Sequence, residues 1–195
     1  MRKGWRRVVV PVAVLATACV FVVQSGLAGA VPAGSGRTRT YFIAAEEVDW
    51  DYAPSNRNQI TGQPFGDQEN VFVENGPDRI GKVYTKALYR EYTDGTFRSR
   101  KPQPAHLGSL GPIIRAEVGD QIDVVFRNRT RFPVSIHPHG VFYNKNSEGA
   151  PYNDGTSGGN KADDAVQPGT AFTYHWDVPD RAGPGPMDGS SVMWM

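Results

Sequence analysis

Cysteine is almost absent from this sequence of 195 residues, which contains one, Cys19. Because Cys19 lies in an apolar stretch near the N-terminus, the rest of the chain has no thiol. This excludes disulfide bonds, a cysteine-ligated zinc site, a thiol nucleophile and a blue-copper centre built by this chain alone. A long basic block is missing as well, so the charge pattern does not indicate nucleic-acid binding.

An excess of charge of either sign is also missing, since 21 Lys and Arg stand against 20 Asp and Glu. Four of the basic residues lie within the first seven positions, and the remainder of the chain is mildly acidic. The 22 glycines and 15 prolines indicate many turns but follow no collagen-like period. A chain of this length suits one domain with a sizeable core.

The first 30 residues predict an export signal. Residues 1–7 are basic, residues 8–23 are almost wholly apolar, and Ala28-Gly29-Ala30 has the spacing of a cleavage site. This order is typical of a cleaved secretory signal, which predicts a secreted protein with no membrane attachment after cleavage. A retained anchor is the alternative, although the apolar run is short for a membrane span. Arg6-Arg7 leaves open whether export follows the general or the twin-arginine route.

After a linker at residues 31–37, the pattern predicts an all-β domain over residues 38–195. No stretch outside the signal has a sustained helical period, whereas several runs alternate apolar and polar residues. Gly- and Pro-containing segments at residues 56–78 and 98–111 predict loops. Several short strands joined by turn-rich loops favour a β-sandwich. The predicted strands cover residues 38–52, 82–92, 113–118, 122–127 and 172–178.

The segment His137-Pro138-His139-Gly140 is the strongest candidate for chemistry. Side chains at positions i and i+2 of an extended chain point to the same face, so two imidazoles are expected side by side. Imidazole ligates copper, zinc, iron and nickel. Two ligands do not complete a copper or zinc site, and two surface or structurally hydrogen-bonded histidines are the alternative.

Other candidate ligands are weaker. In the loop over residues 145–164, Asp163 and Asp164 follow a Gly-rich stretch, and paired carboxylates suit Ca²⁺; a solvated acidic turn is the alternative. His175 falls on the polar side of its predicted strand and is interpreted as a surface residue, and His106 as a structural loop residue. Without a cysteine thiolate, the C-terminal methionines do not indicate a type 1 copper site.

Several separated motifs together closely resemble the N-terminal plastocyanin-like domain of multicopper oxidases, in the ceruloplasmin and hephaestin branch. The resemblance runs from about Thr40 to the end of the chain and covers nearly all of the expected mature sequence. The motifs lie at residues 41–52, 110–120, 124–128, 135–143, 147–150, 162–164, 168–170, 174–179 and 181–186.

This resemblance implies a cupredoxin-like Greek-key β-sandwich or barrel. It implies that His137 ligates the type 2 copper and His139 one copper of the type 3 pair, in a trinuclear cluster that reduces dioxygen to water. The electrons come from a reducing substrate through a type 1 copper elsewhere, so further cupredoxin domains are expected as partners. The alternative is a non-enzymatic A-type domain, as in the coagulation cofactors.

The resemblance also implies a calcium site formed by the Lys145 backbone carbonyl with Asn160, Asp163 and Asp164. The family more often has a longer acid or amide where Asn160 stands. In the family, the segment resembling residues 191–195 continues into a second histidine pair, whereas this sequence stops at Met195. We therefore expect a fragment, incomplete at its C-terminus, that is inactive in isolation.

We expect the mature protein to begin near Val31 and to lie outside the cytoplasm, because residues 1–30 have the order of a cleaved signal. N-terminal sequencing of the secreted protein checks this expectation. An intact Met1 on a protein retained in the cytoplasm contradicts it.

Overall fold

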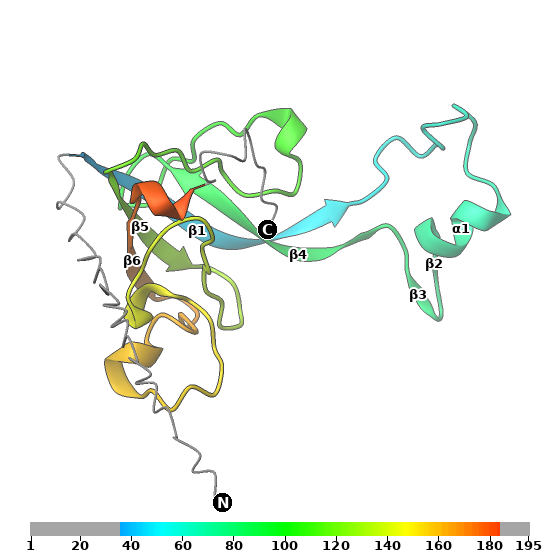
Figure 1. Ribbon diagram of the computed structural model, residues 1–195. Coiled ribbons are helices and arrows are strands. Elements are labelled where there is room, and N and C mark those ends of the chain that lie inside the picture. Colours follow the sequence, from blue (N-terminus) through cyan, green and yellow to red (C-terminus); the bar gives the residue numbers. More distant parts are fainter. Residues whose placement is uncertain (1–35, 184–195) are drawn as a thin grey trace, which may run out of the picture. The chain divides into compact units, whose positions relative to one another are not determined.

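The computed structural model describes residues 36–183, and four strands form one mixed sheet in the order β4-β1-β5-β6 (Figure 1). β1 runs antiparallel to β4 and parallel to β5, and β5 runs antiparallel to β6. The predicted all-β class is confirmed, while the predicted signal lies outside the described residues. The strands are β1 (Thr38–Asp51), β4 (Val83–Tyr92), β5 (Gln121–Asn128) and β6 (Ala171–Asp177).

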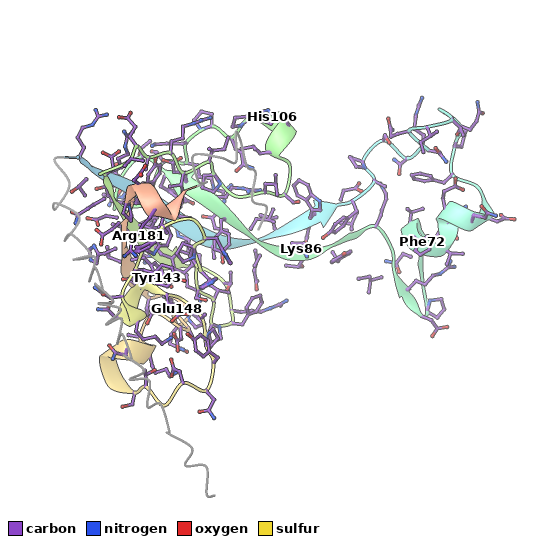
Figure 2. The ribbon with its side chains drawn as sticks, viewed as in Figure 1. Phe72, Lys86, His106, Tyr143, Glu148 and Arg181 are labelled. Atoms are coloured by element: carbon purple, nitrogen blue, oxygen red, sulfur yellow. The ribbon has the colours of Figure 1, made fainter. Side chains whose placement is uncertain are left out.

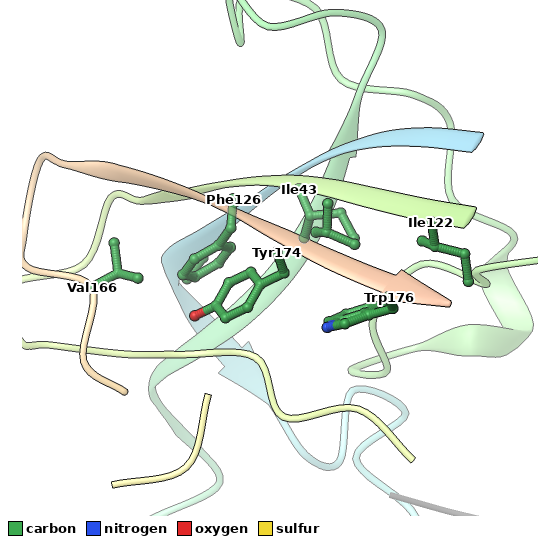
Figure 3. Close-up of a cluster of buried hydrophobic side chains, with 8 residues drawn as sticks. Ile43, Ile122, Phe126, Val166, Tyr174 and Trp176 are labelled. Atoms are coloured by element: carbon green, nitrogen blue, oxygen red, sulfur yellow. The ribbon is translucent and has the colours of Figure 1, made fainter. Parts of the chain in front are cut away.

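Hydrophobic alternation explains the main core. Every second side chain of β5 from Ile122 to Phe126 is buried, and β6 buries Tyr174 and Trp176 in the same cluster. Full burial of each large apolar side chain contributes about 1.5–3 kcal/mol. The buried members of this cluster are Ile43, Ala45, Ile122, Val124, Phe126, Val166, Tyr174 and Trp176 (Figure 3).

Irregular segments pack against this cluster and contribute partly buried side chains from residues 114, 134, 136, 141 and 143. One of these segments carries the histidine pair, so the main core also fixes the backbone of the candidate site. The strand content and the mixed sheet are consistent with the expected cupredoxin-like fold.

A smaller cluster forms around Ala44, Tyr92 and Phe97. Next to it, the buried Glu46 carboxylate accepts hydrogen bonds from the Tyr92 hydroxyl and the Arg100 guanidinium, and it also pairs with Arg129. A buried carboxylate is costly unless it is paired and hydrogen-bonded. These three partners therefore allow an acidic residue in the middle of the central strand.

The predicted loop at residues 56–78 is wrong in part, because it contains the helix α1 (Asp67–Val73) and the strand β2 (Asn75–Gly76), which pairs with β3 (Arg79–Ile80). The Glu69 side chain accepts hydrogen bonds from the Gly66 backbone N–H at 3.0 Å and from Asn58 Nδ2 at 2.8 Å. These bonds satisfy the start of the helix. Seven residues are too few for a helical period to stand out in the sequence.

The predicted strand at residues 113–118 is wrong, because none of these residues belongs to a strand. The hydroxyl of Tyr41 accepts a hydrogen bond from the Arg115 N–H at 2.9 Å and donates one to the Arg115 carbonyl at 2.7 Å. Both backbone groups of Arg115 are thus satisfied by a side chain, and no neighbouring strand is needed.

The other predicted strands are confirmed to within a residue or two at each end. No helix among residues 36–183 combines the length and the apolar character needed to cross a membrane. Short 3₁₀ turns lie in the connections between strands, at η1 (Ala105–Leu107), η2 (Lys145–Ser147) and η3 (Gly158–Lys161), and a fourth, η4 (Asp180–Ala182), follows β6.

Asp120 fastens the start of β1 to the turn before β5. Its buried carboxylate accepts hydrogen bonds from the backbone N–H groups of Glu117 and Arg37, both at 2.9 Å, and from the Arg39 guanidinium. The Glu117 N–H, the Arg39 side chain and the Arg37 N–H, in that order, lower the pKa of Asp120 to about 2.

We expect Asp120→Asn to lower the free energy of unfolding at neutral pH. Because the pKa of Asp120 is lower in the folded protein than its ordinary value of 3.8, the ionised carboxylate stabilises the fold above that value. This contribution disappears as the pH falls from 3.8 towards 2, so the difference between parent and variant should shrink in that window. Urea unfolding at a series of pH values measures it, with the exposed Asp180→Asn as control. A pH-independent difference contradicts the prediction.

Candidate metal centre

Backbone hydrogen bonds fasten the histidine segment on both sides of the histidine pair, to a loop before it and to the sheet after it. Before it, Val134 exchanges backbone hydrogen bonds of 3.2 and 2.9 Å with Val166; after it, Phe142 exchanges two of 2.8 Å with Asp177. Phe142 therefore pairs with the last residue of β6. A groove of about 420 Å³ opens along this segment, lined by the two histidines and by mostly apolar residues, including Ile114, Ile136, Val141 and Trp176.

The structure brings the two imidazoles of the pair together. The ring centroids of His137 and His139 lie 4.9 Å apart with the planes at 89°, and the Tyr143 ring lies 6.0 Å from that of His137. Both histidines are exposed. Two imidazoles within reach of one groove form part of a metal-binding set, since copper and zinc need three or four ligands.

One nitrogen of His137 is already committed to a hydrogen bond. Nδ1 lies 2.7 Å from the backbone carbonyl oxygen of Glu148. A carbonyl only accepts hydrogen bonds, so Nδ1 carries a proton, and in the neutral imidazole Nε2 keeps its lone pair. This hydrogen bond fixes the ring orientation and the tautomer. Histidines that bind metals commonly donate their second ring N–H to a carbonyl or carboxylate in the same way.

The loop over residues 145–164 holds its acidic residues around two lysines. Lys145 Nζ lies 2.9 Å from Glu148 Oε2 and 3.1 Å from Asp154 Oδ2, and Lys161 Nζ lies 3.1 Å from both Asp154 Oδ1 and Asp164 Oδ2. Hydrogen bonding to Glu148 raises the pKa of Lys145, and hydrogen bonds from Thr156 lower the pKa of Asp154. Figure 2 labels Glu148 in this region.

The two predicted calcium-binding carboxylates are buried. Asp163 accepts a hydrogen bond from the Gly149 N–H at Oδ2 over 2.7 Å, and its Oδ1 has no hydrogen-bond partner. Asp164 Oδ2 is buried without a hydrogen bond, and only the Lys161 ammonium lies beside it. Asn160, in η3, is exposed. Nowhere in residues 36–183 do three or more His, Cys, Asp or Glu side chains form a ready metal site.

The two remaining histidines lie at the surface. His175 is 67% exposed, and its Nδ1 lies 2.7 Å from Asp123 Oδ1 across the β5–β6 pairing. His106 is exposed in η1. Neither residue joins the pair at residues 137 and 139.

The sequence did not predict the residues that orient His137 and pack against the histidine segment. Glu148 acts through its backbone carbonyl, which every residue has, so no residue type signals it. Gly149 does leave a signal, because its φ of +68° favours glycine and an added Cβ would lie 2.0 Å from the Ile136 carbonyl oxygen.

Sequence comparisons with known proteins indicate one family. The multicopper oxidase family profile matches residues 106–184. Human ferroxidase HEPHL1 is 49% identical over 183 residues, human hephaestin 44% over 162 and human ceruloplasmin 42% over 156, and the matches cover 91%, 82% and 80% of this chain. A crystal structure of a multicopper oxidase from Pseudomonas thermotolerans aligns with a TM-score of 0.43 at 22% identity, over 75% of this chain and 24% of that one.

The chain therefore contains a multicopper oxidase domain of the cupredoxin-like kind. Within that family, it belongs to the ceruloplasmin and hephaestin branch. It spans about 15% of the length of the curated relatives that it matches.

Proposed function

We propose that this domain contributes one His-x-His pair to the trinuclear copper cluster of a secreted multicopper oxidase, with His137 at the type 2 and His139 at the type 3 position. The whole protein couples one-electron oxidation of a substrate to reduction of dioxygen to water, and further cupredoxin domains complete the cluster. The observation that carries this proposal is the pair of exposed imidazoles 4.9 Å apart, one of which has its Nε2 lone pair free.

Ferrous iron is the reducing substrate that we propose for the whole protein, because one of the relatives is named a ferroxidase. The N-terminal sequence pattern supports secretion.

The residues of this chain position the ligands. The Glu148 carbonyl fixes the orientation of the His137 ring, so Nε2 is already positioned for a metal ion before the ion binds. Bound copper would supply the one-electron chemistry.

We propose in addition that the loop over residues 145–164 binds calcium at the Lys145 carbonyl, Asn160, Asp163 and Asp164. The buried Asp163 Oδ1, which lacks a hydrogen-bond partner, supports this proposal, because such a group is costly unless a partner or an ion satisfies it. The ammonium groups of Lys145 and Lys161 lie beside Asp164, so calcium has to displace at least part of this pairing.

Copper binding by the 195-residue chain should be weak and should depend on both histidines, because two imidazoles leave the ion mostly water-ligated. His137→Ala and His139→Ala should each reduce Cu²⁺ affinity to the level of the double variant, whereas the exposed His175→Ala should not. Calorimetric titration measures the affinity, and an oxygen electrode with a generic reductant should detect no turnover.

In the complete protein, we expect His137→Ala to empty mainly the type 2 position and His139→Ala to disrupt the coupled pair, as measured by copper content and electron paramagnetic resonance. Robust oxygen reduction by the 195-residue chain alone contradicts the proposal. So does a complete protein that lacks both histidines but keeps its copper and its activity.

Calcium should raise the melting temperature of the chain. A ligand that binds only the folded state adds about 2.7 kcal/mol at roughly 100 times its Kd. Asp164→Asn should reduce the shift, and Lys161→Met should enlarge it, because it removes an ammonium group that competes for the Asp164 carboxylate. The exposed Asp180→Asn serves as control in thermal unfolding with calcium or chelator. A parent chain that does not respond to calcium rules out the site.

A further inference from the structure

We propose that Asp163 is the remote carboxylate that positions and polarises His137, acting through the single peptide unit between Glu148 and Gly149. The hydrogen bonds that connect the two residues lie within this chain and do not depend on the proposed copper binding. Only the consequence for metal affinity rests on the proposed copper-binding function of His137.

One peptide group connects the two side chains. Its carbonyl, from Glu148, accepts the hydrogen bond of His137 Nδ1 at 2.7 Å, and its N–H, from Gly149, donates to Asp163 Oδ2 at 2.7 Å. The two groups lie in the same rigid plane and point in opposite directions, because the peptide is planar and trans. A carboxylate that fixes the N–H therefore also fixes the direction of the carbonyl that orients the imidazole.

Close packing keeps this peptide in place. An added Cβ on Gly149 would lie 2.0 Å from the Ile136 carbonyl oxygen, so the Gly149 backbone contacts the histidine segment directly. The Ser135 hydroxyl donates to the Gly149 carbonyl at 2.7 Å. On the other side, the Tyr174 hydroxyl of β6 donates to the Asp163 carbonyl at 2.8 Å. Gly149 is therefore held by the histidine segment, and the backbone of Asp163 is held by the sheet.

Burial makes the charge of Asp163 effective. The residue is fully buried, and hydrogen bonds to an ionised acceptor are about twice as strong as neutral ones. Hydrogen bonds in a chain polarise one another where water is excluded. In its ionised form, Asp163 therefore makes the Glu148 carbonyl a stronger acceptor and the Nε2 lone pair of His137 a better ligand, as a directly bonded carboxylate does for metal-bound histidine.

The same geometry links the loop to the histidine. Asp163 Oδ1 has no hydrogen-bond partner and is free to meet a cation, while Oδ2 holds the peptide. A cation on Oδ1 neutralises the charge that polarises the peptide. Cation occupancy of the loop and the ligand strength of His137 are therefore coupled.

The test uses the 195-residue chain in calcium-free buffer. Nitrogen-15 NMR of the histidine side chains, recorded without metal, should show His137 as the Nδ1–H tautomer. Asp163→Asn keeps the size of the side chain and removes its charge; it should shift part of the His137 population to the Nε2–H tautomer. In a separate calorimetric titration, the same variant should bind Cu²⁺ about tenfold more weakly, the lower end of the effect that outer partners of a ligand have.

Two control variants separate the relay from a general charge effect. Glu148→Gln removes a negative charge from the residue whose carbonyl contacts His137 but keeps that backbone carbonyl, so the His137 tautomer should not change. Asp123→Asn should alter only the signals of His175, its direct partner. An unchanged His137 tautomer in Asp163→Asn, or an equal change in Glu148→Gln, overturns the proposal.

The parent chain provides a readout that needs no variant, which matters if Asp163→Asn does not fold. The Gly149 amide proton is buried and donated to Asp163, so it should exchange slowly with solvent, and fast exchange overturns the proposal. If the tautomer responds as expected but no copper binds, the relay stands and the proposed copper-binding function fails. If copper binds to both histidines but the His137 tautomer is the same in Asp163→Asn and in the parent, the copper-binding function stands and the relay fails.

Discussion

The parallel ladder between β1 and β5 determines where the candidate site forms. It pairs Thr38 with Gln121 and Ala45 with Asn128, so segments far apart in the sequence run side by side. Asp120 fixes one end through three hydrogen bonds. At the other end, the Asn128 side chain donates to the carbonyls of Phe132 and Val166 at 2.8 Å each. The histidine segment begins directly after these Asn128 hydrogen bonds, so its position follows from that of β5.

The sequence predicted strands in which apolar and polar residues alternate, because burial of every second side chain stabilises them. β5 and β6 bury every second side chain, and this pattern is visible in the residues themselves. The failures have a different physical origin. Residues 113–118 look like a strand, but Tyr41, more than 70 residues earlier, satisfies the backbone of Arg115. The helix α1 depends on Glu69 reaching Asn58, another contact that local periodicity does not record.

The candidate site likewise has a part that the sequence predicts and a part that only the tertiary structure reveals. Two histidines with one residue between them are evident in the sequence, and the structure brings them together. Their supporting groups are a backbone carbonyl, a backbone N–H and a buried aspartate from a distant loop. Backbone groups carry no residue type, so only the tertiary structure reveals them. Lys145 was expected only as a backbone ligand, and the pairing of the Lys145 and Lys161 ammonium groups with Asp164 was not predicted, since a lysine is ordinarily a solvated residue.

The strand order has a consequence for how the domain forms during synthesis. β4 precedes β5 in the chain and can pair with β1 first, but the opposite edge of β1 has no partner until β5 has been made. Non-local pairings of this kind form slowly because a long loop has to close first. In the interval, the central strand is an open sheet edge, and such edges pair readily with other chains. Productive folding therefore depends on β5 reaching β1 before a neighbouring nascent chain does.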